Sequence, residues 1–289
     1  MEVKVAKTAG FCFGVQRAVD KVYELIGSCP DRLFTLGPII HNEEVVNDLE
    51  KKGVRVASED DLRTLPEGST VVIRSHGVGK EVYDHLEEYG LSYVDVTCPF
   101  VLKIHRIVEK ESRAGAHIVI IGDPDHPEVV GICGWCMGPY TVIRTEQDAL
   151  DFVFPIDKNI CIVSQTTFNY NKFKDLVEIL CKKRYDNNVL NILNILNTIC
   201  NATEERQREA KSIAGEVDTM LVVGGRHSSN TQKLFEICKK ECGNTYYIQT
   251  PVDLDSDMFQ CSSYVGITAG ASTPKKIIEE VQEHVRIKF

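Results

Sequence analysis

Residues 219–230 read TMLVVGGRHSSN, and this succession of strand, turn and helix start indicates the fold class. Residues 219–223 are β-branched or apolar at every position, which is typical of a parallel strand covered on both faces. Gly224 and Gly225 end the run, and small polar residues then precede a stretch of helical periodicity. Because the same succession recurs along the chain, we predict an α/β protein with mainly parallel sheets.

Six other short β-rich runs end in similar turns. They lie at residues 3–5, 33–36, 71–74, 117–121, 160–164 and 264–268. Residues 15–26 form the clearest expected helix, because apolar residues recur there at helical spacing and give one continuous face. Residues 187–197 fit neither period, since Asn recurs at every third position. We expect a linker there that runs into a strand.

Three sets of residues recur with nearly the same long period. The turn glycines are Gly37, Gly122 and Gly224, separated by 85 and 102 residues. The polar turns begin at Ser75, Ser164 and Thr268, separated by 89 and 104 residues. Three cysteines that precede helical stretches are Cys12, Cys98 and Cys200, separated by 86 and 102 residues. We therefore predict three similar α/β units with pseudo-threefold symmetry: residues 1–97 with the N-terminal strand, residues 98–198 and residues 199–289.

Composition and charge exclude several classes of protein. Of the 289 residues, 43% are hydrophobic and 26% are charged, which is far from the composition of a disordered chain. The net charge of −9 argues against general binding to nucleic acid or to an acidic membrane. No secretory signal or membrane span is visible, so we expect a cytoplasmic protein. Eleven cysteines in a reducing compartment indicate metal or redox chemistry more than disulfides.

Three cysteines are expected at helix N-termini. Pro99 suits the first turn of a helix after Cys98, and Asn201 with Glu204 resembles a capping box after Cys200. The free N–H groups at such a position favour the thiolate, which is the form that binds metal. Three soft ligands suit zinc or an iron–sulfur cluster, and a 4Fe-4S cluster on three thiolates would keep one iron open. The alternative is that these cysteines are small buried hydrophobic residues.

Two closer cysteine pairs have less support as sites. Cys133 and Cys136 have the spacing of a redox or zinc pair, but no second pair lies at the spacing of a zinc ribbon. Cys238 and Cys242 lie one helical turn apart. For both pairs we favour free or partly buried thiols.

The strand-end turns are rich in small polar donors, which predicts a compact anionic ligand. Ligands of α/β proteins bind at the carboxyl ends of strands, where hydroxyls, imidazoles and helix N-termini converge. Neither a dinucleotide-binding glycine pattern nor a P-loop is present, so a nucleotide is not favoured. Glu128 stands between His126-Pro127 and two valines, and partial desolvation would raise its pKa and make it a proton donor near neutral pH. The commoner alternative is a surface carboxylate.

A series of motifs supports these separate signals. They are GFCFGV at 10–15, His41-Asn42, SHGV at 75–78, TCP at 97–99, HPEV at 126–129, SQTT at 164–167, TICNAT at 198–203, Gly224-Gly225 with SSN at 228–230, and GAS at 270–272. In this order and at these spacings they resemble the LytB/IspH family of 4-hydroxy-3-methylbut-2-enyl diphosphate reductases, over essentially the whole chain. The Asn-rich run and the pair Cys133 and Cys136 are not part of the family pattern.

The resemblance implies a three-lobed α/β protein around a central 4Fe-4S cluster. Matching positions imply that Cys12, Cys98 and Cys200 hold the cluster, with one iron open to the allylic hydroxyl of the substrate. The residues implied to surround the diphosphate are His41, His76, His126, Ser228, Ser229, Asn230 and Ser272. The resemblance also implies that Glu128 delivers protons, with His126 in the catalytic set, and that Thr167 positions the hydroxyl.

The implied reaction is the last step of the non-mevalonate (MEP) isoprenoid pathway. Two electrons and two protons remove the hydroxyl as water and give isopentenyl or dimethylallyl diphosphate. The expected partners are this allylic diphosphate and a ferredoxin or flavodoxin as electron donor, with no nucleic acid and no membrane, and the chain is expected to be a monomer.

Two other functions fit parts of the sequence. An iron–sulfur hydro-lyase acting on a phosphorylated substrate also uses three thiolates and an open iron, but it needs no external reductant. A zinc-stapled or redox-sensing binding protein would use Cys133 and Cys136, and its metal would depend on Cys133 and not on Cys12.

Overall fold

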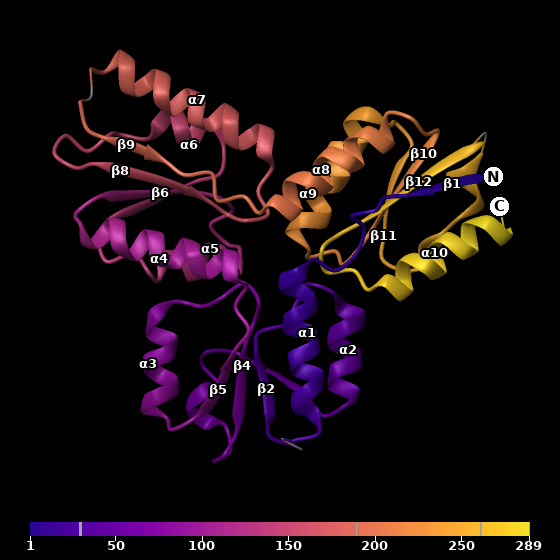
Figure 1. The fold of residues 1–289 in the computed structure, drawn as a ribbon, viewed down its shortest axis with the longest axis horizontal. Helices are drawn as coiled ribbons and strands as arrows, with labels where there is room; N and C mark the ends of the chain where they lie inside the picture. The colour runs from indigo at the N-terminus through magenta and orange to yellow at the C-terminus, as the bar shows by residue number, and fades with distance from the viewer. Residues whose placement is uncertain (29–30, 189, 261, 289) are drawn as a thin grey trace. The chain divides into compact units, whose positions relative to one another are not determined.

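The computed structural model describes residues 1–28, 31–188, 190–260 and 262–288, and in them the chain forms three four-stranded sheets (Figure 1). One sheet has the order β3-β2-β4-β5: β3 (Arg55–Ala57), β2 (Leu33–Leu36), β4 (Thr70–Ile73) and β5 (Ser92–Asp95). A second has the order β7-β6-β8-β9: β7 (Tyr140–Ile143), β6 (His117–Ile121), β8 (Ile160–Ser164) and β9 (Leu193–Ile195). The third has the order β1-β12-β10-β11: β1 (Glu2–Val5), β12 (Tyr264–Ala269), β10 (Thr219–Val223) and β11 (Thr245–Ile248). Neighbouring strands pair in parallel, as in β2 with β4, β6 with β8 and β10 with β12, so the predicted α/β class is confirmed.

The helices follow the strands in the βα succession that the sequence predicts. The α-helices are α1 (Phe13–Ile26), α2 (Glu43–Lys51), α3 (Lys80–Glu88), α4 (Pro99–Arg113), α5 (Pro127–Cys133), α6 (Glu146–Asp151), α7 (Tyr170–Asp186), α8 (Asn201–Ala214), α9 (Ser229–Glu241) and α10 (Lys275–Lys288). Short 3-10 helices are η1 (Leu62–Thr64), η2 (Pro251–Asp253) and η3 (Ser256–Phe259). No helix among the described residues is long and apolar enough to cross a membrane.

The long period in the sequence corresponds to equivalent positions in the three sheets. The sheets can be compared by counting strands from β3, β7 and β11, which lie at one edge of each. The second strands are then β2, β6 and β10, and each is directly followed by one of the turn glycines, Gly37, Gly122 and Gly224. The second set of markers, Ser75, Ser164 and Thr268, lies at the ends of β4, β8 and β12, the third strands. Each cysteine of the third set follows a strand at the opposite edge, β1, β5 or β9. The residues that recur in the sequence therefore occupy equivalent positions in the three sheets.

Both faces of the third sheet are covered, which explains its uninterrupted apolar strands. Leu221 and Val223 pack with α10, whereas Met220 and Val222 pack with α8 and α9. Figure 1 shows the same arrangement, with α10 on one side of β10 and β12 and with α8 and α9 on the other. The alternation follows from the twofold period of a strand, and each fully buried side chain contributes roughly 1.5–3 kcal/mol.

The second sheet is built in the same way. Ile118 and Ile120 face α4 and α5, and Val119 and Ile121 face α6 and α7 (Figure 1). In the first sheet, Val71 and Ile73 pack with α3 and η1. Such burial on both faces requires crossover helices, and these bring every strand to the same direction.

The chain divides into two compact units. One, here called the terminal unit, comprises Met1–Ser28, Pro38–Arg55 and Asn201–Phe289 and holds the third sheet. The other, here called the central unit, comprises Cys29–Gly37 and Val56–Cys200 and holds the second sheet and most of the first. The N-terminal strand β1 pairs with β12. The three-unit division into residues 1–97, 98–198 and 199–289 stays a prediction.

Three local features differ from the sequence-based expectation or refine it. The strand expected at 71–74 runs over Thr70–Ile73, so Arg74 lies just beyond it. Helix α8 begins at Asn201, so this residue occupies the first helical position and the expected capping box is wrong. The Asn-rich run leads into β9 as expected, although Val189 lies outside the described residues.

Candidate active site

The three predicted cluster cysteines each stand at the start of a helix. Cys12 is the N-cap of α1 and Cys98 is the N-cap of α4, with Pro99 in the first turn. Cys200 directly precedes α8. All three thiols are partly exposed. The N-terminal N–H groups of a helix favour an anionic ligand, so each position suits a metal-binding thiolate.

One backbone hydrogen bond fixes each of these cysteines in an equivalent way. The N–H of Cys12 donates to Ala271 O at 3.2 Å, that of Cys98 to Ser75 O at 3.0 Å, and that of Cys200 to Thr166 O at 3.0 Å. Each acceptor lies in the turn after the third strand of a sheet. The residues that follow the acceptors are Ser272, His76 and Thr167. Every cysteine is thus held beside a turn that contains one predicted substrate residue.

The loop before Cys12 is held by side chains of α8. Arg206, buried in the terminal unit, donates from Nε to Thr8 O and from Nη2 to Gly10 O, both at 2.8 Å. Glu209 accepts from the N–H groups of Lys7 and Thr8. Gly10 has φ +102°, a conformation that favours glycine. The loop therefore has little freedom, which suits a ligand that must hold a fixed geometry.

Hydroxyl groups meet between α2, α9 and β12 in the terminal unit. The N-cap Ser228 accepts from Thr231 N–H, and Ser272 Oγ donates to His41 O at 3.1 Å and lies 3.4 Å from Ser228 Oγ. Glycine allows this approach, because a Cβ on Gly225 would lie 2.6 Å from His41 O. Three of the residues predicted to bind an anion, His41, Ser228 and Ser272, are thus in direct contact.

Asn230 is the clearest sign of a ligand in this cluster. Its side chain is 4% exposed, yet within the described residues neither its amide nitrogen nor its amide oxygen has a hydrogen-bond partner. A buried amide without partners costs about 1–3 kcal/mol, so such groups usually have a function. Ser229, beside it, is partly buried at the first position of α9. The N-terminus of α9 offers N–H groups to an anion at the same place.

Two predicted imidazoles meet in the central unit. The rings of His76 and His126 lie edge to face, with 5.4 Å between their centroids. His76 lies in the turn after β4, whereas His126 is the N-cap of α5 and accepts from Glu128 N–H at 3.1 Å. Residues 50 positions apart therefore form one imidazole pair.

Glu128 lies fully inside the protein rather than on its surface. The residue is 1% exposed, in the first turn of α5. Its Oε1 accepts from Thr166 N–H at 2.6 Å, and its Oε2 accepts from Thr166 Oγ1 at 2.7 Å. Burial raises the pKa of Glu128 to about 7, although both hydrogen bonds from Thr166 lower it. The carboxyl is therefore partly protonated at neutral pH and can either donate or accept a proton.

Thr167 lies next to this carboxyl in sequence but contacts a different group. Its Oγ1 accepts from Gln165 Nε2 at 3.0 Å, and the side chain is partly buried. Sequence reasoning chose Thr167 and missed Thr166, the residue that holds Glu128. The position of both threonines directly after β8 was the signal available, but it cannot tell which side chain turns toward α5.

The comparison with protein families decides the assignment. The family model described as LytB protein matches residues 3–286. The chain belongs to the LytB family. The family resemblance inferred from the motifs is thereby confirmed, and all twelve predicted site residues lie within the matched range.

Curated LytB relatives match over nearly the full length. A 4-hydroxy-3-methylbut-2-enyl diphosphate reductase of Caldanaerobacter subterraneus subsp. tengcongensis is 46% identical over 287 residues, covering 99% of this chain and 97% of the relative. The reductase of Alkaliphilus oremlandii is 47% identical and covers 99% of both chains.

Solved structures of such reductases share the fold. A structure of (E)-4-hydroxy-3-methyl-but-2-enyl diphosphate reductase, the terminal enzyme of the non-mevalonate pathway, is 39% identical with a TM-score of 0.70, covering 99% of both chains. The reductase from Plasmodium falciparum is 27% identical with a TM-score of 0.90, covering 99% of this chain and 87% of that one.

The cysteine pair outside the LytB motifs, Cys133 and Cys136, consists of free, partly buried thiols. Burial raises the pKa of Cys133 to about 11 and that of Cys136 to about 12. In the metal-free protein these thiols stay protonated at neutral pH, which agrees with the free or partly buried thiols expected from the sequence.

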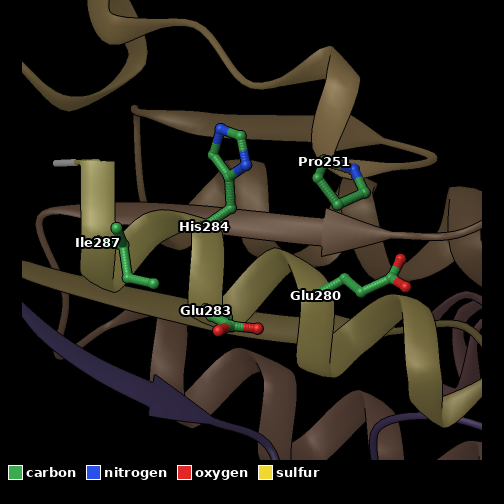
Figure 2. Close-up of a pocket in the computed structure, with 5 residues that line it drawn as sticks. All are labelled: Pro251, Glu280, Glu283, His284 and Ile287. Carbon is green, nitrogen blue, oxygen red and sulfur yellow. The ribbon is translucent and has the colours of Figure 1, made fainter.

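A surface hollow elsewhere in the terminal unit contains none of the LytB site residues. It is lined by Pro251, Glu280, Glu283, His284 and Ile287, at η2 and α10. Figure 2 shows Glu280, Glu283 and His284 pointing in different directions from α10. Their polar groups do not converge on one point, so the hollow is no alternative active site.

Proposed function

We propose that this chain catalyses the reaction of its relatives, the reductive removal of the hydroxyl from 4-hydroxy-3-methylbut-2-enyl diphosphate. The chain is a 4-hydroxy-3-methylbut-2-enyl diphosphate reductase of the non-mevalonate isoprenoid pathway, since identity near 45% extends over almost its whole length. The observation in this chain that best supports the chemistry is the burial of Glu128, which raises the pKa of its carboxyl to about 7 and leaves it partly protonated at neutral pH.

The residues present fit a 4Fe-4S cluster. Cys12, Cys98 and Cys200 are partly exposed thiols at helix starts, and each is anchored by its own N–H to an equivalent turn. Soft thiolates without hard oxygen ligands select iron–sulfur clusters or zinc, and three ligands fall short of a closed structural zinc site. When bound, the cluster would pass the two electrons of the reduction, one at a time, from the external donor to the substrate, and it would supply a Lewis-acidic iron.

Each unit by itself offers donors that suit a diphosphate group. In the terminal unit, Ser228, Ser229, Asn230 and Ser272 supply hydroxyl and amide groups around the N-terminus of α9, and His41, whose backbone carbonyl accepts from Ser272 Oγ, adds an imidazole to the same unit. In the central unit, His76 and His126 supply an imidazole pair. A diphosphate would satisfy the buried amide of Asn230, which has no hydrogen-bond partner in the part of the chain that the structure describes, and the helix N-terminus favours the charge of the diphosphate.

Glu128 transfers the proton, and Thr166 holds its carboxyl in place. The protonated carboxyl of Glu128 donates to the leaving hydroxyl, which departs as water, and the resulting carboxylate keeps both hydrogen bonds from Thr166. These two donors offset part of the desolvation cost of the charge, so the pKa stays near 7 instead of rising further. Thr167 orients the substrate hydroxyl, and His126, bonded to the N–H of Glu128, links the proton donor to the diphosphate site.

The overall reaction balances with two electrons and two protons. One C–O bond breaks, one C–H bond forms, and one water leaves, giving isopentenyl or dimethylallyl diphosphate. The electrons come from a one-electron carrier protein such as a ferredoxin or flavodoxin, and the chain acts as a monomer in the cytoplasm.

Iron content of cysteine variants tests this proposal. After anaerobic reconstitution, the wild-type chain is expected to bind about four iron and four sulfide per chain. Cys12→Ser, Cys98→Ser and Cys200→Ser should each lose most of both, whereas the matched controls Cys133→Ser and Cys136→Ser should retain them. Metal that depends on Cys133 and not on Cys12 would contradict the proposal and support the zinc-stapled alternative. Turnover without any reductant would instead support the hydro-lyase alternative.

A further inference from the structure

The short helix α5 contacts the candidate site of the central unit at both of its ends. Its N-terminal end contributes His126 and Glu128. Its C-terminal end and the following Trp135 contact the turn at 75–79 that contains His76. Because the His76 ring lies against the His126 ring, the position of this turn determines how the two imidazoles face a ligand.

The backbone of the 75–79 turn lies against α5 at two glycines, of which Gly134 has no room for a side chain. A Cβ built on Gly131 would lie 3.5 Å from the carbonyl carbon and oxygen of Gly77. A Cβ on Gly134 would lie only 2.6 Å from the Cα of Gly79. The N–H of Lys80 also donates to Gly134 O at 3.4 Å. The backbone of the turn therefore packs directly on the C-terminal end of α5, where Gly134 lets Gly79 approach.

Trp135 restrains the same turn through its indole ring. The indole Nε1–H donates to Val78 O at 2.9 Å. The ring stacks on His105, with 5.2 Å between centroids and 17° between planes, and His105 is 1% exposed. A Cβ on Gly77 would lie 2.6 Å from Cε1 of His105, so the imidazole contacts this glycine. The indole and the imidazole together hold the two residues that follow His76.

We infer that Trp135 is a positioning residue for the substrate, which holds the 75–79 turn so that His76 and His126 bind the same anionic group. The inference rests on the proposed function, in which both imidazoles bind the diphosphate. Glu128 is held by Thr166 and makes no hydrogen bond to the turn among those described. Loss of the Trp135 hydrogen bond should therefore weaken ground-state and transition-state binding equally, which raises KM and leaves kcat unchanged.

The test uses the fact that Trp135 is the one tryptophan of the chain. Biosynthetic replacement by 3-benzothienylalanine keeps the bicyclic shape and exchanges the indole N–H for sulfur. We expect KM and the Kd of inorganic pyrophosphate, measured by calorimetry on the reconstituted holoenzyme, to rise by about three- to tenfold, the usual effect of one neutral hydrogen bond. Turnover at saturation and iron content should stay within about twofold. Replacement by 5-fluorotryptophan, which retains the N–H, should restore wild-type values.

Phe173→Leu is the matched control. Phe173 is a buried aromatic residue of α7 that packs on the opposite face of the β6 sheet and does not take part in the contacts to the turn. This substitution should lower the melting temperature without changing KM.

The possible results separate the two proposals. Unchanged KM and pyrophosphate Kd in the sulfur analogue of an active enzyme would overturn the role of Trp135. Parallel losses of kcat, iron and affinity would also overturn it, because they indicate a general structural role. A wild-type holoenzyme that neither turns over nor binds pyrophosphate would refute the proposed function itself.

Discussion

Replacement of Thr166 by Val should move the pH dependence of turnover toward alkaline pH. Val keeps the shape of Thr but removes the hydroxyl that donates to Glu128 Oε2 at 2.7 Å. A hydrogen bond to a charged group contributes about 1.5–3 kcal/mol, and one pKa unit corresponds to about 1.4 kcal/mol. The hydroxyl of Thr166 also forms a weaker hydrogen bond with the protonated form of Glu128. Its removal therefore shifts the pKa by less than the full energy of the hydrogen bond to the carboxylate would give. We expect the pKa of Glu128 to rise from about 7 by about one unit.

The assay is kcat at saturating substrate between about pH 5.5 and 9, measured anaerobically with an artificial reductant. Since Glu128 acts as an acid, wild-type turnover should fall tenfold per pH unit above about pH 7. In Thr166→Val the same alkaline fall in kcat, the alkaline limb of the pH profile, should begin about one pH unit higher. Thr166→Ser retains the hydroxyl and should follow the wild-type profile.

A variant without the carboxyl shows whether the limb belongs to Glu128. Glu128→Gln should be slower by about 10²–10⁴-fold, the usual contribution of a general acid, and should lack the limb. Thr166→Val should then have no further effect on the pH profile in the Glu128→Gln background. A limb that stays in place or moves to lower pH in Thr166→Val would refute the reasoning.

The remaining predictions concern stability and binding. Folding raises the pKa of Glu128 from 4.5 to about 7. The contribution of Glu128 to the free energy of unfolding should therefore fall by about 3 kcal/mol as the pH rises from 4.5 to 7. Denaturation of the wild type and of Glu128→Gln at several pH values checks this, because the variant should lack the fall. Gly77→Ala should lower the free energy of unfolding by about 3 kcal/mol, because φ is +70° and the new Cβ would meet His105, whereas Gly90→Ala, at φ +65° in open space, should cost only about 1 kcal/mol. Asn230→Leu should stabilise the ligand-free protein by about 1 kcal/mol while raising KM, and equal KM in the two proteins would remove Asn230 from the diphosphate site.

The second and third strands of every sheet could be predicted from the sequence. Strands such as β6 and β10 are buried on both faces, so their residues must be apolar or β-branched throughout. The strands β3, β5, β7 and β11 were missed because they are short and partly exposed. Exposed positions accept almost any residue, so these strands show no regular alternation of apolar and polar residues that would predict them.

The identity of the site residues could be predicted further than their contacts. The order of the motifs selected Glu128 and the three cysteines, and the structure places each cysteine at a helix start. The roles of Thr166 and Trp135 could not be predicted, because their partners lie far away in the sequence. Thr166 bonds to Glu128, 38 residues away, and Trp135 bonds to Val78, 57 residues away. Which side chain reaches such a partner depends on how the helix packs on the sheet, and one sequence contains no record of that packing.

The most direct test of the central claim is anaerobic oxidation of a reduced viologen dye by the iron-loaded chain, with and without 4-hydroxy-3-methylbut-2-enyl diphosphate. Oxidation is expected only in the presence of the substrate, with two electrons consumed for each water lost. An intact cluster with no substrate-dependent oxidation would contradict the central claim.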